Sequence, residues 1–177
     1  MCYVLRYALL LPIILLALGS QALPSDQEQL IKIEADEAFH DEKKGLTRYS
    51  GDVVMQQGSL KIKAEKIEFN SDASGNMSAL SAKGNPAQFQ QQPEKDQPLV
   101  KGQANIIQYH VEDEKISFIG DAFIQQGEAQ LNSEKITYNL NEQIFKAERS
   151  PSQQATEKPQ RVEMIIPPKT KSQQEKK

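Results

Sequence analysis

The segment Tyr49–Asn70, YSGDVVMQQGSLKIKAEKIEFN, returns in altered form 69 residues further along the chain. The second copy, Phe118–Asn139, reads FIGDAFIQQGEAQLNSEKITYN and is identical to the first at 9 of 22 positions. Weaker echoes occur at Ile31–Asp36, Leu60–Glu65 and Val100–Tyr109. Repeats at a fixed spacing are typical of proteins built from stacked units, and here the smaller unit spans about thirty residues.

Hydrophobic and polar residues alternate with a period of two inside each unit, for example from Leu60 to Ala64. This alternation is typical of strands with one buried face. The phase slips by one residue between Ala64 and Ile67 and again within 131–136, at equivalent repeat positions, as a bulge or corner requires. No window of the chain keeps a helical stripe.

Turn-forming residues recur where strands are expected to end. They are Gly45, Gly51-Asp52, Ser74-Gly75-Asn76, Gly84-Asn85-Pro86, Gly102, Gly120-Asp121 and Asn139–Asn141. The pattern predicts an all-β chain of many short strands. Either a closed core or an open, trough-like stack accommodates the inward residues.

The N-terminus is typical of an export signal. One positive charge precedes an apolar run, Tyr7–Leu18, that is too short for a membrane span of roughly twenty residues. Small residues at Ser20 and Ala22 predict cleavage after Ala22, so that 1–22 is a signal peptide and Cys2 leaves with it. The alternative is an uncleaved single-span anchor. Loss of the one cysteine suits an oxidising compartment such as the periplasm.

The remaining chain is expected to form one domain over 23–166, followed by a basic, disordered tail over 167–177. Leu23–Gln29 and the Gln-, Ser- and Pro-rich segment Ser150–Gln160 are expected to be loose. A last strand is predicted at Val162, Met164 and Ile166.

Composition argues against several classes of function. A net charge of −3 and a pI near 5.5 do not favour a nucleic-acid partner. One cysteine and two histidines are too few for a zinc or iron–sulfur site, so neither a metal nor a cofactor is expected.

No nucleotide-binding loop and no nucleophile elbow occur in the sequence, and we expect no enzymatic activity. His40 and His110 have no Ser or Cys motif beside them and are interpreted as surface histidines rather than general bases. Asp52 and Asp121 follow glycine, which favours a turn role over a carboxylate pair. The paired glutamines before Gly58 and Gly127 are interpreted as polar strand ends, with sugar contact as the alternative.

The apolar phase carries the sharper hypothesis, because it lines either a packed core or a lipid-binding groove. The residues expected to line it are Ile31, Ile33, Ile62, Phe69, Phe89, Ile107, Tyr109, Val111 and Phe118. Lys32, Lys61 and Lys63 lie in the opposite, polar phase. There they serve either a solvated face or contact with phosphate.

Together the paired GD-x-x-x-QQG segments, the K-I-x-A-[DE] strands, the G-x-P-A-x-F motif at Gly84–Phe89 and the I-T-Y at Ile136–Tyr138 resemble the OstA-like family of lipopolysaccharide-transport proteins of Gram-negative bacteria. The resemblance covers Gln29–Ile166. It implies an incomplete, open-ended β-jellyroll of about sixteen short antiparallel strands. It also implies a periplasmic bridge that shelters lipid A acyl chains in an apolar groove.

The partners implied by this resemblance are lipopolysaccharide, a membrane-anchored jellyroll at the inner membrane, a receptor jellyroll at the outer membrane, and further copies of the chain stacked head to tail. The inward family positions fall on Ile31, Ile33, Phe89, Tyr109 and Val111. Two alternatives stay open: a membrane-anchored partner of the same family, and a structural or carbohydrate-binding β-domain without lipid transport.

Overall fold

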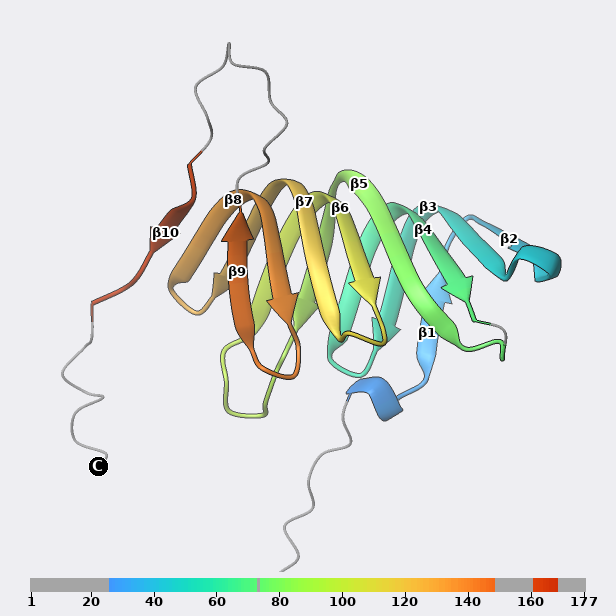
Figure 1. Ribbon diagram of the computed structural model, residues 1–177, viewed down its shortest axis with the longest axis horizontal. Helices are drawn as coiled ribbons and strands as arrows, with labels where there is room; N and C mark the ends of the chain where they lie inside the picture. The colour runs from blue at the N-terminus through green and yellow to red at the C-terminus, as the bar shows by residue number, and fades with distance from the viewer. Residues whose placement is uncertain (1–25, 73, 149–160, 169–177) are drawn as a thin grey trace, which may run out of the picture.

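The computed structural model describes residues 26–72, 74–148 and 161–168 (Figure 1). Within these residues it contains ten β-strands and two short 3₁₀ helices, η1 (Asp26–Glu28) and η2 (Glu42–Lys44). The strands are β1 (Ile31–Glu34), β2 (Glu37–Asp41), β3 (Leu46–Gln57), β4 (Leu60–Ser71), β5 (Met77–Gln91), β6 (Val100–His110), β7 (Lys115–Gln126), β8 (Ala129–Asn139), β9 (Ile144–Glu148) and β10 (Glu163–Ile165).

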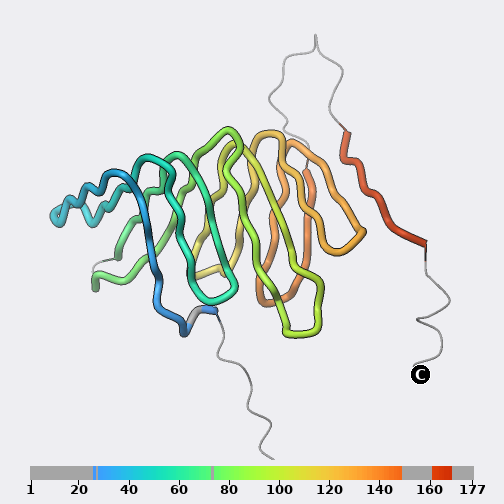
Figure 2. Tube along the Cα trace, turned by 180° about the vertical axis from the view of Figure 1, so that it is seen from behind, coloured from blue at the N-terminus to red at the C-terminus, as the bar shows by residue number. Residues whose placement is uncertain are grey.

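All described strand pairs are antiparallel, and the order in the sheet is β1-β3-β4-β5-β6-β7-β8-β10. Strand β2 pairs with β3, and β9 pairs with β8. Consecutive hairpins therefore stack along the long axis, with β2 near one end and β10 at the other (Figures 1 and 2).

Each of the six long strands, β3 to β8, passes through a bend near its middle. In β3 the bend is at Gly51 and Asp52, with φ of 81° and 40°, and in β7 it is at Gly120 and Asp121, with φ of 79° and 49°. The β3–β4 and β7–β8 ladders shift register at these points. Two successive residues with positive φ turn a strand sharply, and glycine takes the first position without a steric penalty.

The bends fold the sheet into two facing layers. One layer, here called the β1 half, contains β1, β10 and residues 53–57, 60–63, 87–91, 100–104, 122–126 and 129–133. The other, the β2 half, contains β2, β9 and residues 46–50, 66–71, 77–83, 106–110, 115–119 and 135–139. The bends form the upper margin in Figure 1, and the hairpin loops form two free margins below.

The all-β class and the open sheet agree with the sequence, but the strand count does not. The resemblance implied about sixteen short strands, whereas the described residues form ten. Counting each of the six bent strands as two and adding the four short ones gives 12 + 4 = 16 segments. The discrepancy arises because backbone pairing continues through each bend.

Several predicted turns lie inside strands rather than at their ends. Gly51-Asp52, Gly84-Asn85-Pro86, Gly102 and Gly120-Asp121 all belong to strands, whereas Ser74–Asn76 does separate two strands. The other turn signals agree as well: Gly45 ends η2, and the Asn139–Asn141 segment closes β8. The predicted phase slip after Ala64 is confirmed by a register shift between Lys63 and Lys66.

The segment before β1 is better anchored than its composition predicts. The Asp26 carboxylate accepts hydrogen bonds from the Ser59 backbone N at 2.6 Å, the Ser59 hydroxyl at 2.7 Å and the Gln91 side chain at 3.1 Å. These bonds hold η1 against the β3–β4 hairpin, so the prediction of a loose segment is wrong for its described part.

The predicted last strand is present as β10, which pairs with β8 through Met164 and Leu131. The predicted signal peptide 1–22, the linker 150–160 and tail residues 169–177 lie outside the described residues. Among the described residues, no helix has the length and apolar character needed to cross a membrane.

Candidate lipid-binding interior

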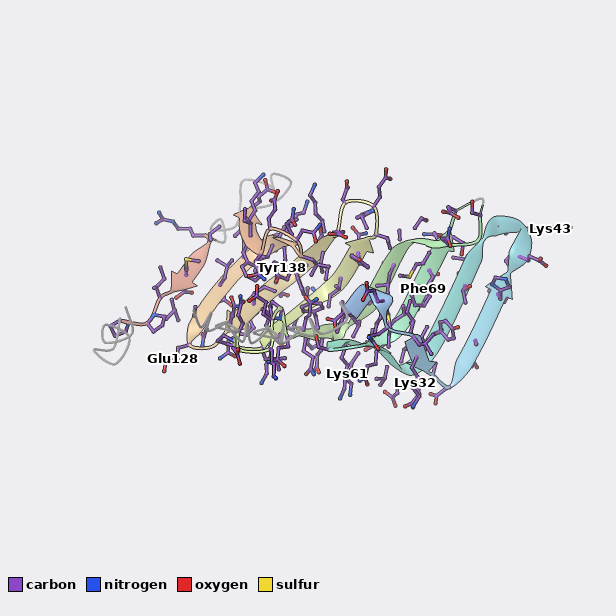
Figure 3. The ribbon with its side chains drawn as sticks, turned by 90° about the horizontal axis from the view of Figure 1, so that it is seen from below. Lys32, Lys43, Lys61, Phe69, Glu128 and Tyr138 are labelled. Carbon is purple, nitrogen blue, oxygen red and sulfur yellow. The ribbon has the colours of Figure 1, made fainter. Side chains whose placement is uncertain are left out.

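The interior between the two halves is built from the inward phase of every strand. Alternation places each second residue between the layers, where its side chain is removed from water. The buried apolar residues are Val53, Met55, Leu60, Ile62, Ile67, Phe69, Leu80, Ala82, Ala87, Phe89, Val100, Ala104, Ile107, Tyr109, Ile116, Phe118, Ala122, Ile124, Leu131, Ile136 and Tyr138. Phe69 and Tyr138 mark this layer in Figure 3.

The residues predicted from sequence come together in this interior. Six of them are buried in one contiguous core: Ile62, Phe69, Phe89, Ile107, Tyr109 and Phe118. Ile33 and Val111 are partly buried and pack against the same core. Ile31 is 40% exposed at the β1 edge, so it lies at the rim of the interior rather than inside it.

Aromatic pairs fill the interior at intervals along the long axis. Phe89 and Phe118 meet edge to face with ring centroids 5.4 Å apart, and Tyr138 stacks on Phe145 at 4.2 Å. Burial raises the pKa of the Tyr138 hydroxyl above its ordinary value. The middle of the interior is thus an apolar layer packed by the protein's own side chains.

Both ends of the interior expose apolar residues on strands with an unpaired edge. At the β1 and β2 end these include Ile31 and Leu30, and at the β9 and β10 end they include Met164, Ile166 and Ile144. Strand edges with free backbone donors and acceptors are ready to pair with another strand. The apolar layer therefore continues to both ends of the described fold.

The two free margins touch through side chains of two loops. Gln143, between β8 and β9, accepts a hydrogen bond from Gln97 at 3.3 Å and donates one to Glu94 at 3.4 Å. Gln97 and Glu94 lie in the loop between β5 and β6. These two contacts join the β1 half to the β2 half on the side opposite the bends.

The polar candidates have structural roles. Asp52 and Asp121 are bend residues, as their positive φ shows. In the repeated glutamines, Gln56 donates to the Gly58 carbonyl at 3.4 Å and Gln125 donates to the Gly127 carbonyl at 3.0 Å, so each braces its hairpin.

The two histidines lie in strands and are exposed, and His40 Nδ1 is 2.8 Å from the Thr47 hydroxyl. Among the described residues, no group of three or more His, Cys, Asp and Glu side chains is placed to hold a metal ion.

Sequence reasoning missed other interior residues, among them Met55, Leu80, Ile116, Ile124 and Tyr138. Their alternation with polar neighbours is the same signal that identified the predicted set. What the alternation lacked was the assignment of each strand segment to one of two facing layers.

Comparison with known proteins places this interior in a family. Residues 32–144 match the family model described as LptA/(LptD N-terminal domain) LPS transport protein. The chain is 37% identical, over 96% of its length and all of the relative's, to the lipopolysaccharide export system protein LptH of Pseudomonas aeruginosa. It is 34% identical to LptA of Haemophilus influenzae over 71% of this chain and 74% of that one.

A solved structure agrees with the fold. The crystal structure of Pseudomonas aeruginosa LptH, described as the LptA homologous periplasmic component of the conserved lipopolysaccharide transport device, is similar with a TM-score of 0.75 and 35% identity. The match covers 82% of this chain and all of that one. The chain therefore belongs to the LptA/(LptD N-terminal domain) family of lipopolysaccharide transport proteins.

Proposed function

We propose that this chain carries lipopolysaccharide through the periplasm, with the acyl chains of lipid A lying in the interior between its two halves. The observation that carries the proposal is the continuity of the inward apolar layer from β1 to β10, with apolar residues exposed at both ends. Family membership supplies the class of cargo.

The physical need for such a layer is large. Exposing one twelve-carbon acyl chain to water costs on the order of 10 kcal/mol, at ~0.8 kcal/mol per methylene. A lipid with several chains does not cross an aqueous compartment freely at that cost. An interior that is apolar along its whole length shelters the chains at each step while the sugars and phosphates stay hydrated.

Acyl chains enter this interior when the two free margins separate. The interior is filled by its own side chains, so a guest displaces the contact between layers rather than occupying a vacant channel. The margins are joined by the hydrogen bonds of Gln143, which are long and exposed. Such bonds contribute only about 1 kcal/mol each, so opening along this line is the least costly route.

The unpaired strand edges provide the contacts to partners. In this proposal β1 and β2 of one jellyroll pair with β9 and β10 of the next, which joins the apolar interiors end to end. The neighbours are further copies of the chain, an anchored jellyroll at the inner membrane and a receptor jellyroll at the outer membrane. Energy for directed movement is supplied by those partners.

Site-specific photo-crosslinking to lipopolysaccharide tests the lipid path. A photoreactive amino acid at Phe89, which is buried between the layers, is compared with one at its neighbour Gln88, which points outward. We expect lipopolysaccharide adducts at position 89 and few at position 88. Equal adducts at both positions, or none at position 89, would overturn the interior path.

A further inference from the structure

The outer face of the β1 half has an unusual charge distribution. Twelve side chains on β3 to β8 point outward there, at positions 54, 56, 61, 63, 88, 90, 101, 103, 123, 125, 130 and 132. Three of them are lysines (Lys61, Lys63 and Lys101), seven are Gln or Asn, and none is Asp or Glu. The whole chain has more acidic than basic residues, so the absence of carboxylates here is a local segregation of charge.

The side chains form a ladder across the strands. Lys61 is the cross-strand partner of both Gln56 and Gln90, and Lys101 is the partner of both Gln90 and Gln125. Neighbouring strands lie about 4.8 Å apart, so Lys61 and Lys101 are separated by roughly 10 Å with an amide between them. Figure 3 shows Lys61 beside Lys32 of β1, both pointing away from the interior that Phe69 marks.

The face is also hollowed. A depression of about 390 Å³ lies over β4 to β7 and is lined by Lys61, Lys63, Gln88, Lys101, Gln103 and Phe123 among others. That volume is within the range of small-molecule sites. Lys63 and Lys101 are exposed and form no ion pair with any described residue.

The opposite outer face, on the β2 half, differs. There Glu68 neutralises both Arg48, at 2.7 Å, and Lys66, at 3.0 Å, and Glu148 pairs with Lys146 at 2.7 Å. An anion approaching the β2 half meets carboxylates among the cations, whereas one approaching the β1 half meets lysines and amides alone. Electrostatic attraction therefore favours the β1 half.

We infer that the outer face of the β1 half binds a phosphorylated saccharide through Lys61, Lys63 and Lys101. Ammonium groups pair with phosphate, and Gln side chains both donate to and accept from sugar hydroxyls. Phe123 adds an apolar ring beside Gln103 in the same hollow. An anion without hydroxyls uses the lysines but not the glutamines.

The position of the face connects it to the proposed lipid path. Lys61 comes two residues after Ser59, in the β3–β4 hairpin that forms part of the free margin of the β1 half. A lipid whose acyl chains enter between the margins leaves its phosphorylated sugars at that margin, next to the lysine and glutamine ladder. This assignment of the saccharide to lipopolysaccharide rests on the proposed function, whereas the charge and shape of the face do not.

The test measures binding of an acyl-free saccharide to the purified mature chain. The probe is the core oligosaccharide of lipopolysaccharide after complete deacylation with its phosphates retained, and titration calorimetry gives Kd. We expect Lys63→Gln/Lys101→Gln to raise Kd by about tenfold, because each charged hydrogen bond contributes roughly tenfold or less in affinity. The matched control is Lys83→Gln/Lys115→Gln, which removes two lysines from the outer face of the β2 half and is expected to leave Kd unchanged.

Further probes identify the ligand. The same oligosaccharide without phosphates is expected to bind more weakly to the wild-type chain and equally to both double variants. Inorganic phosphate binding as tightly as the phosphorylated oligosaccharide would overturn the saccharide assignment. So would binding of phosphatidylglycerol vesicles through Lys63 and Lys101 without any binding of the oligosaccharide.

Failure of this inference is distinguishable from failure of the lipid path. Crosslinking from position 89 reports acyl chains in the interior, whereas the acyl-free probe reports only the outer face. Adducts at position 89 combined with equal oligosaccharide binding by both double variants would overturn the outer-face site alone. Oligosaccharide binding that depends on Lys63 and Lys101, combined with no adducts at position 89, would overturn the interior path alone.

Discussion

The backbone of Gly102 passes directly beneath the ring of Phe118. A Cβ atom on Gly102 would lie 2.5 Å from Cε1 of Phe118 and 2.8 Å from Cδ1 of Ile124. Phe118 is fully buried and packs edge to face on Phe89, so its ring has nowhere to move without disturbing the centre of the interior. The absence of a side chain at position 102 is therefore a packing requirement of β6.

Gly102→Ala is expected to lower the free energy of unfolding by about 1–3 kcal/mol, the usual cost of overpacking a core. Chemical denaturation followed by circular dichroism measures it. The control is Gln103→Ala, which changes the outward neighbour and is expected to have a small effect. Phe118→Leu should relieve part of the Gly102→Ala penalty in the double variant, and strict additivity would contradict the contact.

Ile33→Asp is expected to weaken lipopolysaccharide loading far more than Lys32→Asp, by roughly tenfold or more, because a carboxylate at the inward position places a charge against acyl chains. Both residues lie in β1, on opposite faces. Lys32→Asp breaks only the exposed pair with Glu34, which contributes little. Native mass spectrometry of the loaded protein compares the two, and equal losses would count against an interior lipid path.

Glu68 makes stability depend on pH in a defined direction. Hydrogen bonds from Lys66 and then Arg48 hold the pKa of its carboxyl below the ordinary value of 4.5. Because the folded pKa is lowered, this stabilisation is complete above the unfolded pKa and is lost as pH falls through the folded pKa. Glu68→Gln should therefore cost about 0.5 kcal/mol or so at pH 7 and almost nothing at low pH.

Urea denaturation of both proteins at several pH values between 7 and 3 measures this difference. The wild-type chain is expected to lose more stability over that interval than Glu68→Gln. Parallel pH curves for the two proteins would show that the ion pairs seen around Glu68 do not stabilise the fold.

Removing the contacts between the free margins is expected to speed lipid uptake. Glu94→Ala/Gln97→Ala removes both partners of Gln143 and leaves Gln143, with its φ of 55°, unchanged. The loss of stability should be about 1–2 kcal/mol at most. Hydrogen exchange should rise in the loops between β5 and β6 and between β8 and β9. Lys95→Ala, in the same loop, is the control, and unchanged uptake and exchange in the double variant would contradict opening at this margin.

Much of the candidate site was predictable because alternation is a local property. Ile62, Phe69, Phe89, Ile107 and Phe118 were assigned to one apolar surface from period-two spacing, and all are buried in one cluster. Ile31 was assigned by the same rule but is partly exposed, because it belongs to an edge strand with no neighbour on one side. Alternation identifies the face of a strand but not the number of neighbours that cover it.

The sequence by itself determined the all-β class, the duplicated hairpin, the inward face of most strands and the family. These follow from repeat spacing and side-chain alternation, which are visible along the chain. Only the tertiary structure decided that pairing continues through Gly51-Asp52 and Gly120-Asp121, so that ten strands are formed instead of sixteen. It also decided that the two layers close on each other, that Gln143 meets Gln97 and Glu94, and that Lys61 and Lys101 lie on one carboxylate-free face. Those relationships join residues distant in sequence, and the register of the ladders and the angle of each bend, rather than any local pattern, bring them together.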